Sequence, residues 1–263
     1  MTAPKLSDLR QEYEDLFNSC IITKPLPVQE VVDAILKNKN RYDTVAKTST
    51  VPWFVIAVIH NMECSLNFKQ HLHNGDPLSK KTVHVPAGRP PGWDGTGTWE
   101  ESALDALSYD NLTSWSDWII AGICYELEAY NGWGYRHHGI HTPYLWSFTN
   151  HYTSGKYTED GVWSESAVSD QCGCAAVLRR LAEMGKVTFD DQPIAKPDMP
   201  PPVRYSKAMP TDPAEVTAAK VLQQWLSSFS GVFLAVDGVA GNKTSDAFKI
   251  VTGHYLVGDP RAA

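Results

Sequence analysis

The residues best suited to acid–base chemistry lie in one stretch of the chain, residues 51–82. The stretch opens with Pro52, which suits a first helical turn, and residues 53–59 carry no charge, so we expect a helix that is apolar on every face. Glu63 lies near the end of that helix. Because burial and the helix dipole both oppose a negative charge there, they raise the pKa of Glu63. Glu63 is therefore our candidate general acid near neutral pH.

A second carboxylate follows in a polar setting. Asp76 lies in the turn sequence of residues 74–77, thirteen positions after Glu63, and Thr82 follows six positions later. Two carboxylates in unlike environments form the acid and base pair expected of glycoside hydrolysis. We predict that Glu63 protonates the leaving oxygen. Asp76, with Thr82 nearby, then holds and activates a water molecule on the opposite face of the sugar.

The separation of these groups indicates the stereochemistry. If Asp76 positions a water molecule, its carboxyl lies about 6.5–9.5 Å from that of Glu63, whereas a nucleophile lies about 5–5.5 Å away. We expect the longer distance and inversion, since a polar loop separates the two residues. Glu100, Glu101 and Asp105 are alternative second carboxylates, although the helix dipole alone explains acids in a first helical turn.

The segment 131–157 is the part of the chain richest in aromatic and amide side chains. Sugar sites combine aromatic faces with planar hydrogen-bonding groups, so we expect this segment to form the far wall of a substrate cleft. Residues 82–85 alternate between polar and apolar side chains and predict a short strand in a β-ribbon beside that cleft. The candidate substrate-binding residues are Asn131, Trp133, Tyr135, Tyr144, Trp146, Asn150, His151 and Tyr152.

Three short motifs lie around the candidate acid. Residues 60–68, HNMECSLNF, resemble the helix end of the lysozyme-like superfamily, in which a catalytic Glu precedes a small-residue turn and an Asn-Phe pair. The spacing of Asp76 and Thr82 resembles the Asp-x5-Thr of phage lysozymes, where the gap from Glu to Asp is shorter. Residues 129–135, AYNGWGY, are similar to a segment of the goose-type lysozyme and lytic transglycosylase branch, although the Gly-Leu-Met-Gln motif of transglycosylases is absent.

This resemblance implies a peptidoglycan hydrolase that cleaves the β-1,4 bond between N-acetylmuramic acid and N-acetylglucosamine. Three alternatives stay open. A lytic transglycosylase would use Glu63 alone as acid and then base and would leave an anhydro-sugar end. A chitinase-type enzyme would cleave chitin oligomers, and a non-catalytic protein would only bind the cell wall.

Composition and charge restrict the possible partners. The chain has 263 residues, of which 43% are apolar, so it can bury a large core. A net charge of −7 argues against a nucleic-acid partner. The N-terminus is acidic and amphipathic rather than signal-like, and no apolar run is long enough to enter a membrane. We expect a monomer that is made in the cytoplasm and reaches peptidoglycan glycan strands after release, as a phage endolysin does.

The cysteines and histidines give no sign of a metal site or cofactor. Five Cys is an odd number for a disulfide framework, and we expect reduced core thiols. Two groups of histidines, in segments 71–73 and 137–141, lack a companion ligand at a familiar spacing. We therefore expect neither a metal nor a cofactor.

Apolar periodicity predicts a mainly α, lysozyme-like α+β fold. We expect helices over residues 6–17, 28–36, 51–63, 100–109, 114–130 and 164–184, with the small β-ribbon between the third and the fourth. Seven prolines between positions 193 and 213 indicate a linker. We predict a catalytic domain over residues 1–190, a linker over 191–213 and a module over 214–263 that resembles peptidoglycan-binding domains and packs on the catalytic domain.

Overall fold

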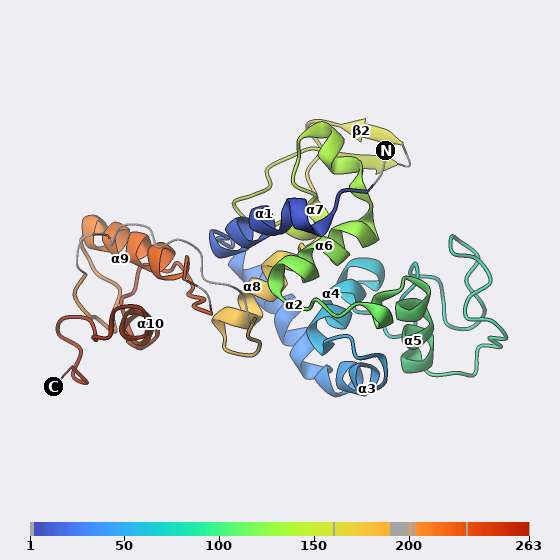
Figure 1. Cartoon of the computed structure of the whole chain (residues 1–263), viewed down its shortest axis with the longest axis horizontal. Helices are drawn as coiled ribbons and strands as arrows, with labels where there is room; N and C mark the ends of the chain where they lie inside the picture. Colours follow the sequence, from blue (N-terminus) through green and yellow to red (C-terminus); the bar gives the residue numbers. More distant parts are fainter. Residues whose placement is uncertain (1–2, 160, 190–199, 201–202, 230, 263) are drawn as a thin grey trace.

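The computed structural model describes residues 3–159, 161–189, 200, 203–229 and 231–262. The described chain is mainly helical with one small two-stranded sheet, as the sequence predicts (Figure 1). Its first part contains α1 (Leu6–Asn18), α2 (Pro25–Lys37), α3 (Lys39–Ser49), α4 (Trp53–Cys64), α5 (Trp99–Tyr109), η1 (Leu112–Ser114), α6 (Ile120–Asn131), η2 (Trp133–His138), α7 (Pro143–Trp146), β1 (Lys156–Glu159), β2 (Val162–Ser164) and α8 (Cys174–Glu183). The last part contains α9 (Pro213–Leu226) and α10 (Asn242–Thr252). None of the described helices is long and apolar enough to span a membrane.

Helix α4 lies at the centre of the larger part of the molecule, because its sequence is apolar on every face. Residues 55–59 are completely buried, and α4 packs against both α3 and α8. Ser65 ends the helix in the left-handed region, with φ 47°, and Leu66 follows with φ 60°. Two consecutive non-glycine residues in that region bend the chain sharply after Glu63. The predicted central helix and its abrupt end are therefore confirmed.

The predicted strand at residues 82–85 is wrong. The backbone N–H groups of Val83 and His84 donate to the Asp76 carboxylate, so these residues lie in a loop and have no partner strand. The sheet lies later in the chain, where β1 and β2 pair antiparallel with Lys156 opposite Ser164. The expected β-ribbon is therefore present at another place in the sequence.

Two predicted helices begin later than expected, and two described α-helices, α3 and α7, were not predicted. Helix α6 begins at Ile120 rather than near Ser114, because the chain is extended at Trp115 after the short helix η1 and Asp117 pairs with Arg10 of α1. Helix α8 begins at Cys174, since residues 162–164 belong to β2. Helix α3 is more polar than its neighbours, and its weak apolar pattern explains why the sequence did not reveal it.

The five cysteines are free and buried, as expected for core thiols (Cys20, Cys64, Cys124, Cys172, Cys174). Burial raises the pKa of Cys20, Cys64 and Cys172 to about 12. These thiols therefore stay protonated at neutral pH and serve packing rather than reactivity.

The C-terminal module, residues 203–262, has its own apolar cluster between α9 and α10. It also contacts the larger part. Phe233 packs edge-on against Phe17 and Phe189 at ring-centroid distances of 5.7 and 5.6 Å, and Arg179 of α8 donates to the Leu234 carbonyl over 3.1 Å. Figure 1 shows the module on the side of α8, away from the N-terminus of the chain. Residues 191–199 and 201–202 of the predicted linker lie outside the described residues.

Candidate active site

Glu63 lies in the last turn of α4, and its side chain is partly buried. Burial raises the pKa of Glu63 to about 7, the Tyr144 hydroxyl opposes this rise, and the negative charge of Asp110 adds to it. Tyr144 donates to Glu63 Oε1 over 2.9 Å. The carboxyl can therefore carry a proton at neutral pH and is held in one orientation by a hydrogen bond.

Two tyrosines form one wall beside Glu63. Tyr144 is held in α7, whose N-terminus is capped by the Thr142 side chain and begins with Pro143. The Tyr130 ring lies against the Tyr144 ring at a centroid distance of 6.4 Å, and its hydroxyl donates to the Leu72 carbonyl over 3.3 Å. Both tyrosine pKa values are raised, with burial as the main cause, so both hydroxyls remain donors at neutral pH.

Asp110 is a site residue that the sequence reasoning missed. It follows α5 as its C-cap, and burial raises its pKa. Its charge raises the pKa of Glu63, and its side chain is hydrogen-bonded to that of Tyr130. The sequence did carry a signal, because a carboxylate at a helix C-terminus opposes the dipole in the same way as Glu63 does. The Asp110 charge thus acts on Glu63 within one partly buried cluster that also contains Tyr130 and Tyr144.

The Asp76 carboxylate is occupied by its own loop. Its Oδ2 accepts from the backbone N–H groups of Val83 and His84 over 2.7 and 2.9 Å, and its Oδ1 contacts His84 Nδ1 at 2.7 Å. Burial opposes its charge, but the hydrogen bonds from His84 and Val83 outweigh burial and lower the pKa of Asp76 to about 2. Such a carboxylate is ionised at neutral pH and is a weak base. The catalytic role of Asp76 therefore stays a prediction, whereas the structure shows that its carboxylate binds the loop at Val83 and His84.

Thr82 belongs to the same loop. Its Oγ1 donates to the Pro86 carbonyl and accepts from the Arg89 backbone N–H over 2.9 Å. The side chain is only 3% exposed. Thr82 therefore closes the turn of residues 82–89. A catalytic water would have to share a hydroxyl that already makes two hydrogen bonds, so the predicted role of Thr82 stays a prediction.

The three alternative carboxylates also have structural partners. Glu100 makes a two-point contact with Arg41, at 2.6 and 2.9 Å. Glu101 completes a capping box with Thr98 at the start of α5. Asp105 pairs with Arg89 at 2.6 Å and contacts His73 Nε2 at 2.8 Å. These contacts explain the carboxylates without a catalytic role.

Four of the predicted substrate-binding residues serve the fold. Trp146 is 1% exposed in the main apolar core, so the prediction that its face contacts sugar is wrong. Asn150 accepts from the Ile21 N–H and donates to the Ser19 carbonyl, which holds the chain after α1. The Tyr152 hydroxyl donates to the Gly155 carbonyl and accepts from the Ser169 backbone N–H. His151 contacts the Ser19 hydroxyl through Nε2.

The other predicted substrate-binding residues form two groups. Tyr144 contacts Glu63, and Asn131 donates to Thr142 Oγ1 over 3.0 Å at the start of the same short helix. Trp133 and Tyr135 lie in the preceding short helix η2. The Tyr135 ring packs edge-on with Tyr157 and Trp163 of the small sheet, and Trp133 packs against Tyr125. The structure thus brings Tyr144 to the acid, places Asn131 at the start of the helix that holds Tyr144, and gives the η2 aromatics a separate cluster.

The histidines of segment 71–73 are engaged by protein groups. His71 contacts Ser102 Oγ at 2.6 Å and the Lys80 carbonyl at 2.8 Å, and His73 contacts Asp105. Within the ranges that the structure describes, no group of three or more His, Cys, Asp and Glu residues is arranged to hold a metal ion.

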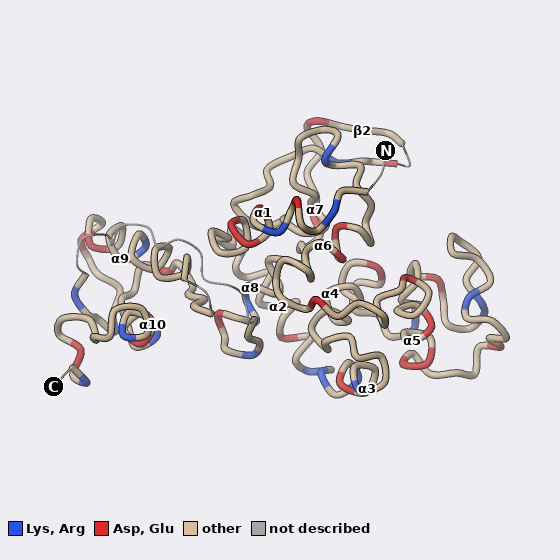
Figure 2. Tube along the Cα trace, viewed as in Figure 1, with Lys and Arg blue, Asp and Glu red and all other residues tan. Residues whose placement is uncertain are grey.

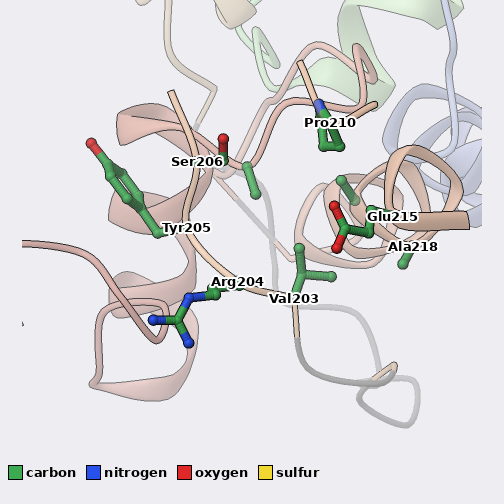
Figure 3. Close-up of a pocket in the computed structure, with 9 residues that line it drawn as sticks. Val203, Arg204, Tyr205, Ser206, Pro210, Glu215 and Ala218 are labelled. Carbon is green, nitrogen blue, oxygen red and sulfur yellow. The ribbon is translucent and has the colours of Figure 1, made fainter. Parts of the chain in front are cut away.

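The module has a pocket of about 320 Å³ between α9 and the chain before it. Its lining is Val203, Arg204, Tyr205, Ser206, Pro210, Glu215, Ala218, Ala219 and Ala240. Figure 3 shows the Glu215 carboxylate beside Val203, with the Arg204 guanidinium pointing away from it. The pocket therefore presents one carboxylate on a mainly apolar wall.

Replacing Tyr144 with Phe tests the contact to Glu63. The Tyr144 hydroxyl lowers the pKa of Glu63, so its removal is expected to raise that pKa above about 7. The alkaline limit of any Glu63-dependent activity should then move to higher pH, which a pH–rate profile measures. Tyr152→Phe, which removes a hydroxyl bonded to Gly155 instead, is the matched control. An unmoved or lowered limit in Tyr144→Phe would contradict the contact.

Replacing Asp76 with Asn tests the loop. The pKa of Asp76 is lowered to about 2 from 3.8, so its ionised form stabilises the fold above pH 3.8 and this contribution is lost as pH falls toward 2. Asp76→Asn should lower the free energy of unfolding by about 1–3 kcal/mol at pH 7. Urea unfolding at pH 7 and pH 3 should show the difference shrinking at the lower pH. Exposed Asp94→Asn is the control, and equal stability of parent and Asp76→Asn at pH 7 would exclude the loop role.

No family model, curated protein or solved structure matches the chain. The function must therefore be inferred from the site itself.

Proposed function

We propose that the chain is a peptidoglycan hydrolase, a muramidase that cleaves the β-1,4 bond between N-acetylmuramic acid and N-acetylglucosamine. The observation that carries the proposal is the Glu63 carboxyl, whose pKa is raised to about 7 and which accepts a hydrogen bond from Tyr144. A protonated carboxyl at neutral pH is what glycosidic bond cleavage requires of its acid. The choice of peptidoglycan rests on the resemblance of residues 60–68 and 129–135 to lysozyme-like enzymes.

In the proposed reaction, Glu63 donates its proton to the leaving glycosidic oxygen as the bond to the anomeric carbon breaks. The Tyr144 hydroxyl then stabilises the carboxylate that forms, because it already donates to Oε1. A water molecule completes hydrolysis at the anomeric carbon. Asp76 is the base that the sequence predicts, and Asp110, whose charge acts on Glu63, is the alternative that the structure adds.

A lytic transglycosylase is the second candidate, and a specific observation favours it. Both oxygens of Asp76 and the hydroxyl of Thr82 are bonded within their own loop. An enzyme that needs one carboxyl alone would tolerate this arrangement, since Glu63 would act first as acid and then as base while the substrate's own hydroxyl attacks. Its products carry an anhydro-sugar end.

The resemblance of the module to peptidoglycan-binding domains supports a role at the wall. We assign wall binding to the module, whose Glu215 pocket suits an amino group of the wall peptides. Synthesis in the cytoplasm followed by release to the wall, as in phage endolysins, completes the proposal. Acidic and basic residues are mixed along both parts of the chain, so contact with the wall would depend on local sites (Figure 2).

Mass spectrometry of digested peptidoglycan tests the proposal and separates the candidates. A hydrolase adds one water per cleaved bond and leaves a reducing muramic acid end, whereas a transglycosylase leaves products lighter by one water. Chitin oligomers in the same assay test the chitinase-type alternative. Intact glycan strands after incubation would contradict both enzyme assignments and favour a wall-binding protein.

A further inference from the structure

A turn in the segment between α4 and α5 carries the most exposed large apolar side chain among the described residues. Val85 is 89% exposed and Val83 is 56% exposed. Pro86 and Ala87 continue the same turn, so residues 83–87 form one small aliphatic tip. The segment that carries the tip extends beyond α5, away from the rest of the molecule (Figure 1). Aliphatic side chains gathered on a projecting turn indicate a contact surface rather than packing within the chain.

Hydrogen bonds close the turn below the tip. The Thr82 N–H donates to the Arg89 carbonyl, and the Gly88 N–H donates to the Thr82 carbonyl, both over 2.8 Å. The Arg89 guanidinium is fixed to Asp105 of α5 by two hydrogen bonds of 2.6 and 3.0 Å. The fold therefore holds the tip in one shape before any partner binds, so binding loses little conformational entropy.

Five polar backbone groups of the tip are already bonded inside the protein. They are the N–H groups of Val83 and His84 and the carbonyls of His84, Val85 and Pro86. Their partners are three side chains at the base of the turn, Asp76, Asn74 and Thr82. Pro86 itself has no N–H to satisfy. A backbone bonded in this way loses little when it leaves water for an apolar interface, where unsatisfied backbone groups are costly.

The base of the turn is basic, in contrast to the chain as a whole. Residues 77–93 contain Lys80, Lys81 and Arg89 and no Asp or Glu, while the whole chain has a net charge of −7. Arg89 is paired with Asp105, but the two lysines are exposed and make no ion pair with the described residues. Their charge therefore remains available to an anionic partner.

We propose that this turn docks on the surface of an anionic lipid bilayer, with Val83 and Val85 at the boundary of headgroups and acyl chains. Lys80 and Lys81 then lie beside the lipid phosphates. An aliphatic tip on a cationic base matches the order of groups in such a surface. A soluble polyanion would attract the lysines but would not bury the valines. The contact is peripheral, because the turn is far too short to cross a bilayer. It goes beyond the proposed cleavage reaction and does not depend on it.

Sedimentation of the full-length protein with lipid vesicles tests the proposal. We expect saturable binding at low ionic strength to vesicles of phosphatidylglycerol and phosphatidylcholine in equal parts, and much weaker binding to phosphatidylcholine alone. Each lysine near an anionic membrane contributes about fivefold, so Lys80→Gln combined with Lys81→Gln should weaken binding about 30-fold. Val83→Ser combined with Val85→Ser should weaken binding about 10-fold or more, since the tip then has no large aliphatic groups to bury.

Matched variants at other exposed positions serve as controls. Lys5→Gln combined with Lys47→Gln removes the same charge elsewhere, and Ile250→Ser changes an aliphatic side chain of α10 that is 75% exposed. Both should bind like the parent, and an unchanged unfolding midpoint shows that each variant is folded. The proposal is overturned if the parent does not bind, if it binds both kinds of vesicle equally, or if either turn variant binds like the parent. Unchanged binding in the valine variant alone would identify a general attraction to polyanions instead.

Discussion

Replacing Glu63 with Gln is expected to lower the rate of peptidoglycan cleavage at least about 10²–10⁴-fold, the usual contribution of a general acid. Gln has nearly the same shape and can keep the contact to Tyr144, but it has no proton to donate to the leaving oxygen. Dye release from labelled walls at pH 6 measures the rate. The matched control is Glu14→Gln, since burial also raises the pKa of Glu14 in α1, far from Tyr144 in sequence. Equal activity of parent and Glu63→Gln would end the proposal.

The same variant should not lose stability. The pKa of Glu63 in the folded protein is about 7, above the ordinary 4.5, so ionisation weakens the fold as pH rises from about 4.5 to 7. Glu63→Gln cannot ionise and should be more stable than the parent by about 1–3 kcal/mol at pH 8, with a smaller difference at pH 5. Urea unfolding at the two pH values checks this. A large stability loss at both would mean that inactivity reflects unfolding.

Replacing Arg179 with Ala should produce the largest loss of stability, about 3–5 kcal/mol. The change leaves Glu183 without its buried partner and removes donors from the carbonyls of Phe17, Asn18 and Leu234. We also expect the module to separate from the larger part, because Leu234 belongs to the module. Thermal unfolding and small-angle scattering measure the two effects.

The neighbouring Arg180 provides the control for this prediction. It pairs with Glu183 at 3.3 Å and with Gln29, but its side chain is 32% exposed. Arg180→Ala should therefore cost less than about 1 kcal/mol, as exposed ion pairs do. A similar small loss in Arg179→Ala would show that the buried guanidinium does not hold the module.

The environment of Glu63 could be predicted because its causes are local. An apolar run of residues 53–59 buries the helix, and the end of that helix holds the carboxyl in a desolvated place. The raised pKa follows from these two facts without tertiary detail. The second carboxylate could not be assigned in this way, since Asp110 reaches Glu63 through the fold rather than through the sequence around it.

The loop after Glu63 shows why the alternating polar and apolar residues 82–85 do not form the predicted strand. Residues 82–85 have the side-chain pattern of a strand, but a strand also needs partners for its backbone N–H groups. Here Asp76 supplies those partners, at Val83 and His84. The same hydrogen bonds lower the pKa of Asp76, so one set of contacts accounts for both the missing strand and the weak basicity of this carboxylate.

The aromatic segment shows a similar limit. Composition identified a segment rich in aromatic and amide residues, but it could not show which of their side chains reach the acid. Trp146 and Tyr144 are both buried in the main core, and only Tyr144 contacts Glu63, through its hydroxyl. The short α7 helix makes this difference, because consecutive positions of a helix point in different directions.

The most direct test of the central claim is to measure the pKa of Glu63 and the pH dependence of cleavage on the same protein. Carbon-13 resonances of labelled glutamate carboxyls, assigned by comparison with Glu63→Gln, give the pKa. The account predicts a value near 7 and a cleavage rate on soluble glycan fragments that falls above pH 7 with the same pKa. A Glu63 pKa near the ordinary 4.5, or a cleavage rate that does not change between pH 6 and pH 8, would contradict it.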